Sequence, residues 1–97
     1  MLDNSALTNK DIEILFFRAR KLEKLGYYRE ALKDYEFINR FHSSSINLKS
    51  VHLAMAVCLE KLERKEDAIM LLERFESAHG TSQEIDLRID ELKSVSF

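Results

Sequence analysis

The chain has 97 residues, of which 45% are hydrophobic and 33% are charged, and it contains two glycines and no proline. This composition indicates one soluble domain, residues 1–97, of helices joined by short turns, and it disfavours an all-β fold, which needs more turn residues. The formal net charge of -2 gives no excess of basic residues, so nucleic acid is not an expected partner.

A first helix is predicted from about Asn9 to Leu25. Thr8 can accept a hydrogen bond from the first helical turn, and Asp11 follows at the spacing of a capping box. Leu7 can pack against Ile12 as a hydrophobic staple. Apolar side chains then recur at helical spacing along one face, namely Ile12, Leu15, Phe16, Ala19, Leu22 and Leu25.

Gly26 ends this helix, because glycine can adopt the left-handed conformation that closes a helix C-terminus. The apolar periodicity resumes at once, which predicts a second helix from about Tyr28 to His42 and a helical hairpin over about 9–42. The small side chain of Ala31 lets the two backbones approach closely, and Tyr35 and Ile38 fill the space further along the helix.

A second hairpin is predicted over about 46–79. Ser45 is the expected cap of its first helix, whose wide apolar face makes it the most buried element. The second helix of this hairpin is expected at about Lys65 to His79, where Gly80 can end it. The apolar face of the preceding helix consists of Leu48, Val51, His52, Met55, Ala56, Leu59 and Leu62.

A fifth helix is predicted over about 82–95, with Thr81 and Glu84 as its capping box. Its apolar stripe is narrow, since it comprises Ile85, Ile89, Leu92 and Val95 among charged residues. We interpret it as a helix that caps the last hairpin and covers the face that would otherwise be left open.

The two hairpins are related by an internal repeat. Aligning Ala31 with Ala68 matches the chain to itself at a separation of 37 residues, which is in the range of helical repeats. Seven further pairs agree in this register: Ala19 with Ala56, Leu22 with Leu59, Leu25 with Leu62, Glu30 with Asp67, Leu32 with Ile69, Tyr35 with Leu72, and Ile38 with Phe75.

These residues resemble the tetratricopeptide repeat. The first hairpin is similar to one repeat through Ala19, Leu22, Leu25, Gly26, Tyr28, Glu30, Ala31 and Tyr35, and the second hairpin is similar to a more degenerate one. The period is about three residues longer than the usual 34, and Glu63 stands where the first repeat has Gly26. The resemblance implies an all-α fold, a right-handed α-α superhelix of two hairpins plus the capping helix, and binding of a protein or peptide in a concave groove.

Carried over residue by residue, the resemblance also implies which side chains face that groove. Apolar residues at its centre would contact a bound segment, and charged residues at its edges would orient it. The alternative is that the apolar members pack against the opposite helix, or that the chain itself fills the groove. The expected binding residues are Phe16, Arg20, Lys24, Leu53, Val57, Glu60 and Lys61.

Four aromatic residues lie off the repeat stripes, Phe17, Tyr27, Phe37 and Phe41. Phe37 and Phe41 are one helical turn apart, so they share a face that is a candidate for self-association. Contact with the third helix across the repeat junction explains the same pair equally well.

The sequence contains few candidates for catalytic or metal-binding residues. The single cysteine, Cys58, is expected to be a small core residue, and its spacing from His52 places the two on different sides of a helix. The acidic residues, including Glu30 and Asp34, are interpreted as a charged outer surface. We therefore expect no catalytic site, no cofactor and no metal.

The leading hypothesis is a non-enzymatic protein-protein interaction module. The alternative is a small tetratricopeptide-like chaperone or assembly subunit that pairs with itself, as a homodimer, or with a partner, as in bacterial secretion or envelope assembly. No signal peptide or long apolar run is seen, so a cytoplasmic protein without membrane insertion is expected.

Overall fold

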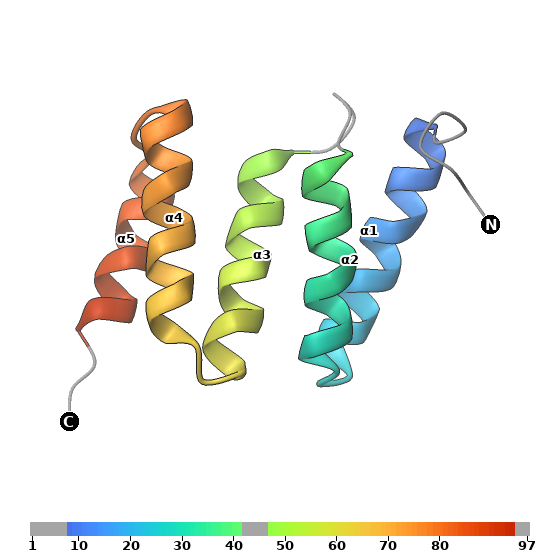
Figure 1. The fold of residues 1–97 in the computed structure, drawn as a ribbon, viewed down its shortest axis with the longest axis horizontal. Helices are drawn as coiled ribbons and strands as arrows, with labels where there is room; N and C mark the ends of the chain where they lie inside the picture. Colours follow the sequence, from blue (N-terminus) through green and yellow to red (C-terminus); the bar gives the residue numbers. More distant parts are fainter. Residues whose placement is uncertain (1–7, 42–46, 95–97) are drawn as a thin grey trace.

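A computed structural model describes residues 8–41 and 47–94 of the chain (Figure 1). This part is all-helical and contains no strand. Five helices run alternately up and down, and each packs mainly against the next one in the chain. They are α1 (Asn9–Lys24), α2 (Tyr28–Arg40), α3 (Leu48–Lys61), α4 (Lys65–His79) and α5 (Gln83–Lys93).

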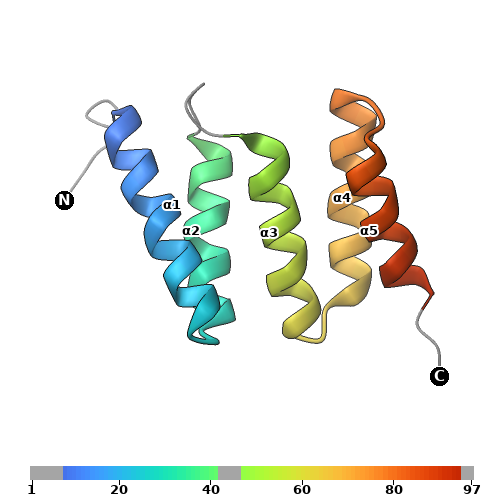
Figure 2. The ribbon, with the colours of Figure 1, turned by 180° about the vertical axis from the view of Figure 1, so that it is seen from behind.

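The helices form a thin slab with principal extents of 46 × 30 × 16 Å. Seen from behind, α1 lies in front of α2 at one end of the slab, and α5 lies in front of α4 at the other (Figure 2). The first and last helices therefore lie on the same face. None of the described helices is long and apolar enough to cross a membrane.

The first hairpin begins and turns as its sequence predicts. The Thr8 hydroxyl accepts a hydrogen bond from the Asp11 amide at 3.1 Å, and the Asp11 carboxylate accepts one from the Thr8 amide at 3.0 Å, which completes the capping box. Gly26 has a φ of 87°, in the left-handed region. The helix ends within one residue of the prediction, with Leu25 as its C-cap, but the prediction that Leu25 belongs to the apolar face is wrong, because this residue is 64% exposed.

The turn of the second hairpin reproduces that of the first without a glycine. Glu63, which aligns with Gly26, has a φ of 65°, an uncommon conformation for a residue with a side chain. Gly80 ends α4 with a φ of 94°, as predicted. The second helix ends at Arg40, before the predicted His42, which lies outside the described residues together with Leu7, Ser45 and Val95.

The caps of two helices differ from those predicted. Asn47 caps α3, since its Oδ1 accepts a hydrogen bond from the Ser50 amide at 3.1 Å. The residue before α5 is Ser82 and not Thr81, and it makes no side-chain cap. Its amide donates instead to Oε2 of Glu76 on α4 at 3.2 Å, so a tertiary contact replaces the expected capping box.

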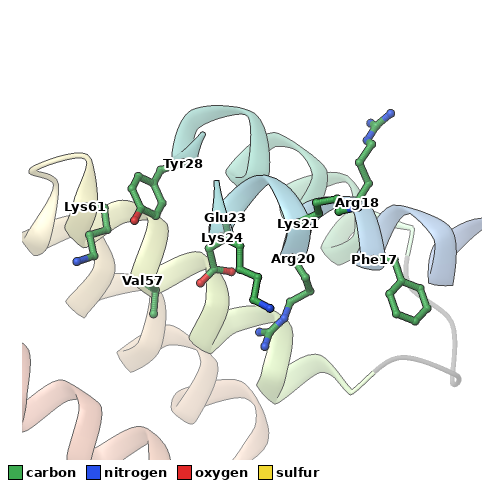
Figure 3. Close-up of a pocket in the computed structure, with 9 residues that line it drawn as sticks. All are labelled: Phe17, Arg18, Arg20, Lys21, Glu23, Lys24, Tyr28, Val57 and Lys61. Atoms are coloured by element: carbon green, nitrogen blue, oxygen red, sulfur yellow. The ribbon is translucent and has the colours of Figure 1, made fainter. Parts of the chain in front are cut away.

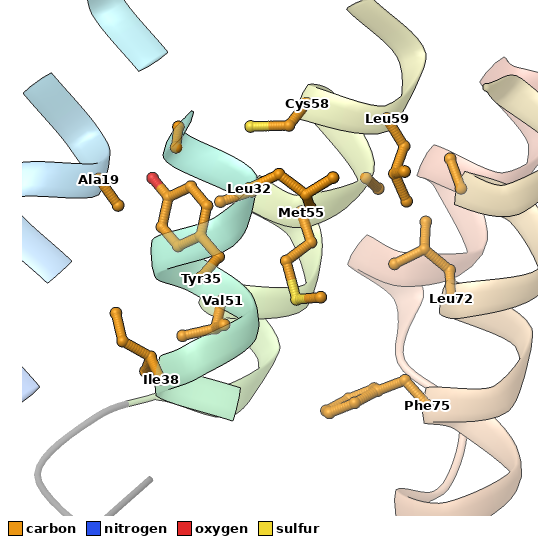
Figure 4. Packing of buried hydrophobic residues seen from close by; sticks show 14 of the residues in the cluster. Ala19, Leu32, Tyr35, Ile38, Val51, Met55, Cys58, Leu59, Leu72 and Phe75 are labelled. Carbon is orange, nitrogen blue, oxygen red and sulfur yellow. The ribbon is translucent and has the colours of Figure 1, made fainter. Parts of the chain in front are cut away.

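The core is continuous through the stack. α3 carries seven buried residues, more than any other described helix, which confirms the prediction that it is the most buried element. The aligned alanines Ala19, Ala31, Ala56 and Ala68 are all fully buried. Figure 4 shows the fully buried ring of Tyr35 between α1 and α3. The buried core thus combines small and large side chains in close contact.

One prediction about the surface is wrong. Asp34, expected on a charged outer face, is buried on α2 with a residue exposure of 8%. Its carboxylate accepts two hydrogen bonds from Arg18 of α1, from Nε at 2.8 Å and from Nη2 at 2.7 Å. Helical periodicity gives no sign of such a pair, because it depends on how two helices are rotated against each other.

Candidate functional site

A groove with a volume of about 800 Å³ opens between α1, the start of α2 and α3 (Figure 3). Its walls carry both apolar and basic side chains. The lining residues are Phe17, Arg18, Arg20, Lys21, Glu23, Lys24, Tyr28, Val57 and Lys61.

A second, shallower hollow of about 300 Å³ lies between α3 and α5. Val57 lines both hollows, so they adjoin on the face formed by α1, α3 and α5. The lining residues of this second hollow are Leu53, Val57, Glu84, Leu87, Arg88 and Glu91.

The structure brings together most of the binding residues expected from the sequence. Arg20, Lys24, Val57 and Lys61 line the large groove, and Leu53 lines the adjoining hollow. The predicted cluster therefore spans α1 and α3 in space, although its members are up to 41 positions apart, from 20 to 61.

Phe16 and Glu60 line neither hollow. Phe16 is half-buried, where its ring meets the ring of Tyr35 edge-on with centroids 6.0 Å apart, and the Arg20 guanidinium lies 6.0 Å from its centroid. Phe16 thus packs against the core and contacts Arg20, one of the residues that line the groove. Glu60 accepts a hydrogen bond from Arg88 at 2.6 Å, which joins α3 to α5.

Several groove residues were not predicted as binding residues. Phe17 is 75% exposed, and its position off the repeat stripe was the available signal. Arg18 and Lys21 form a basic ridge with Lys24 that is visible in the sequence, although Arg18 points away from the other two (Figure 3). Tyr28 belongs to the interior stripe of α2 but also reaches the groove, because it opens that helix.

The contribution of α5 was also not predicted, since this helix was interpreted only as a solvating cap. Leu87 is 56% exposed and lines the smaller hollow together with Arg88. The available signal is the same as for Phe17, because Leu87 is a large apolar residue outside the apolar stripe of its own helix.

The large groove is strongly basic on a chain whose net charge is -2. Within the described residues, Arg20, Lys21, Lys24 and Lys61 form no ion pair. The one acidic residue in the lining, Glu23, accepts a hydrogen bond from the buried Tyr35 hydroxyl at 2.8 Å. Burial and this bond raise the pKa of Tyr35, so the hydroxyl stays a donor. The groove therefore presents four cations that form no direct ion pair within the described residues, beside a single carboxylate.

The pair proposed for self-association lies on α2 and just beyond its end. The rings of Phe37 and Phe41 contact each other with centroids 4.7 Å apart. Phe37 is 38% exposed, whereas Phe41 is half-buried against the core. Self-association through this pair remains a prediction.

Cys58 lies in the core between α2 and α3 and is fully buried. Burial, with a smaller contribution from the negative charge of Glu23, raises the pKa of its thiol to about 12. Such a thiol is not ionised near neutrality, which argues against a nucleophilic role for this residue.

The histidines of the described part lie in helices, and they make ordinary packing contacts. Nδ1 of His52 is 2.9 Å from the Leu48 carbonyl oxygen, and its ring contacts the ring of Phe75 at a tilt of 42°, with centroids 4.5 Å apart. Phe75 contacts the exposed His79 at the same distance. No group of three potential metal ligands occurs among the described residues.

Comparisons with models of protein families, with curated proteins and with solved structures find no match to this chain.

Proposed function

We propose that this protein is a non-enzymatic protein-protein interaction module, a tetratricopeptide-like right-handed stack of two hairpins and a capping helix. In this proposal the groove between α1 and α3 binds a helix or an extended segment of another protein. The observation that carries the proposal is the combination, in one open groove, of apolar side chains with four cations that have no ion pair in the described residues.

The composition of the groove supports binding of a peptide. Phe17, Tyr28 and Val57 offer apolar surface, which provides affinity for a partner side chain when water is displaced. Arg20 and Lys24 offer charges that orient the partner. This mixture suits a peptide, because a peptide presents a polar backbone together with apolar and charged side chains.

The scaffold beneath the groove also supports the proposal. Ala19 and Tyr35 are fully buried, and the Tyr35 hydroxyl is fixed by Glu23 at the groove wall. A groove built on packed helices loses little conformational freedom on binding, which favours affinity.

The alternative, a chaperone-like or assembly subunit that pairs constitutively, has an observation of its own. Seven large hydrophobic side chains in the described residues are exposed. Two of them, Leu25 and Tyr27, flank the turn at Gly26, at 64% and 56% exposure. Exposed apolar side chains gathered at one place favour a stable interface.

Selection of peptides from a random display library tests the main proposal. The peptides enriched on the wild-type protein are measured for binding to Val57→Glu, which places a carboxylate at the junction of the two hollows. Met70→Glu is the matched control, because Met70 is 47% exposed on α4 and lines neither hollow. Circular dichroism checks that both variants fold.

We expect Val57→Glu to weaken binding of the selected peptides by at least about tenfold, as for a central interface residue, and Met70→Glu to leave binding unchanged. Equal binding by the wild type and both variants would show that the groove is not the binding surface. Peptides that depend on Met70 or on the turn at Gly26 would favour the alternative.

A further inference from the structure

The outer face of α5 is acidic and carries an exposed leucine. Asp86, Leu87 and Asp90 are all exposed, and their spacing places them on one side of the helix. Asp86 and Asp90 form no ion pair within the described residues. The Asp86 carboxyl group raises the pKa of Glu76 on α4, chiefly through a hydrogen bond between the two side chains.

The large groove has the complementary character. Its cations include Lys21, Lys24 and Lys61, which form no ion pair with another described residue, and its apolar lining includes the exposed Phe17 and the half-buried Val57. A helix that presents a leucine beside two carboxylates matches this arrangement in both polarity and charge.

The dimensions also match. α5 has 11 residues and is therefore about 16 Å long at 1.5 Å per residue. The lining residues of α1 run from 17 to 24 and span about 12 Å by the same measure. The part of α5 from Asp86 to Asp90, about 7 Å long, therefore fits within the length of the groove.

Within one chain this docking does not occur, since α5 packs on α4 at the opposite end of the slab from α1 (Figure 1). Leu87 nevertheless lies on the same side of the molecule as the groove, because the hollow that it lines shares Val57 with the groove. Two copies placed face to face can each offer α5 to the groove of the other. Such a reciprocal contact closes on itself as a two-fold dimer.

We infer that the chain forms a two-fold dimer in which α5 of each copy lies in the basic groove of the other. Leu87 of one copy contacts Phe17 and Val57 of the second, and Asp86 and Asp90 meet its groove lysines. The inference rests on the groove of the proposed function, which it deepens: the second copy occupies the site in the absence of a partner, and a partner must displace it.

Sedimentation equilibrium of the full chain tests this arrangement by charge reversal. We expect the wild type to dimerise, and Lys24→Glu and Asp90→Lys each to raise the dimer dissociation constant by at least about tenfold. Combining both changes in one chain, or mixing the two single variants, pairs the reversed charges with each other and restores dimerisation. Lys33→Glu and Glu36→Lys, at exposed positions of α2 outside both hollows, are the matched controls and leave the constant unchanged.

Three results would overturn the inference: a wild-type monomer throughout the concentration series, failure of the reversed pair to restore dimerisation, or growth beyond two copies. Its failure is distinguishable from that of the proposed function. If the protein is a monomer that still binds selected peptides in a Val57-dependent manner, the dimer inference is rejected and the proposed function stands. If the protein is a dimer that yields no groove-dependent peptides, even after Asp90→Lys opens the groove, the proposed function in binding other proteins is rejected.

Discussion

The guanidinium of Arg18 on α1 donates two hydrogen bonds to the buried carboxylate of Asp34 on α2, at 2.8 and 2.7 Å. The bonds to Asp34 and its negative charge raise the pKa of Arg18, although the Arg18 side chain is itself 62% exposed. The pair therefore joins a solvated cation to a carboxylate that has little access to water, and it fixes how α1 rests on α2.

Arg18→Ala is expected to reduce the free energy of unfolding by about 1–2 kcal/mol, because the Asp34 carboxylate loses a charged donor while it remains largely buried. Urea denaturation followed by circular dichroism measures the change. Arg29→Ala, at an exposed position of α2, serves as the control and should alter stability by less than about 0.5 kcal/mol. Equal effects of the two substitutions would show that the pair contributes nothing.

Substitutions at the two equivalent turns, at Gly26 and at Glu63, should have opposite effects on stability. Both have positive φ, and a Cβ added at Gly26 would have no atom within 4 Å, so only backbone strain decides the effect of a substitution there. Gly26→Ala should destabilise the protein by about 1 kcal/mol, and Glu63→Gly should stabilise it by up to about 1 kcal/mol. Thermal and urea unfolding of the two variants measure these changes, and a loss of stability in both would contradict the expectation.

Stability should decline in alkaline solution because of Cys58. Its thiol has a pKa raised from 9.0 to about 12 in the folded chain, so between these values the native state holds a proton that the unfolded state releases. The contribution of this thiol to the free energy of unfolding is therefore fully present below about pH 9. It falls as the pH rises above 9, by at most about 1.4 kcal/mol per pH unit for one group. Tyr35, whose pKa is also raised, adds to the decline at higher pH.

Urea unfolding between pH 8 and about 10.5 measures this slope. Cys58→Ala lowers stability at every pH because it removes a buried side chain, but it should make the slope shallower. A slope identical in wild type and variant would show that the thiol does not titrate on unfolding.

Glu76→Gln should stabilise the protein at neutral pH. The wild-type pKa of Glu76 is raised above its ordinary value of 4.5 by the hydrogen bond with Asp86, so the native state favours the protonated acid. The contribution of this group to stability is present below about pH 4.5 and is lost as the pH rises through the raised value. Glutamine removes the charge and keeps an oxygen that can accept from the Ser82 amide.

The measurement is the melting temperature as a function of pH. We expect wild type and Glu76→Gln to melt alike in acid and the variant to melt higher at neutral pH. Glu66→Gln, on the exposed first turn of the same helix, should show no such divergence. A constant difference between Glu76→Gln and wild type across the pH range would rule out the carboxyl pair as its cause.

The sequence by itself determined the number and order of the helices and most of their buried faces. Helical periodicity is set by local geometry, so the stripes through Ile12, Ala31, Leu72 and Ile85 became core residues as expected. The turns at Gly26 and Gly80 followed for the same reason, since positive φ is a local requirement that glycine meets at low cost. The prediction failed at Leu25, where the periodic pattern continued past the end of the helix.

The tertiary structure alone decided which charges are solvated and which are paired. Asp34 and Glu30 look alike in the sequence, yet only Asp34 is buried against Arg18, because the rotation of α1 on α2 brings that one carboxylate inside. The amide of Ser82 likewise found its acceptor on a different helix, Glu76 on α4. Such contacts join side chains across helices, where sequence periodicity carries no information.

The candidate site was likewise predicted only in part from the sequence. Arg20, Lys24, Val57 and Lys61 were predicted by repeat position and do meet in one groove. The excess of positive charge in this groove was not predictable, because it depends on which neighbouring charges form ion pairs once the helices are packed. Only the assembled stack shows that Arg20, Lys21, Lys24 and Lys61 form no ion pair among the described residues and that the exposed Leu87 of α5 shares their face.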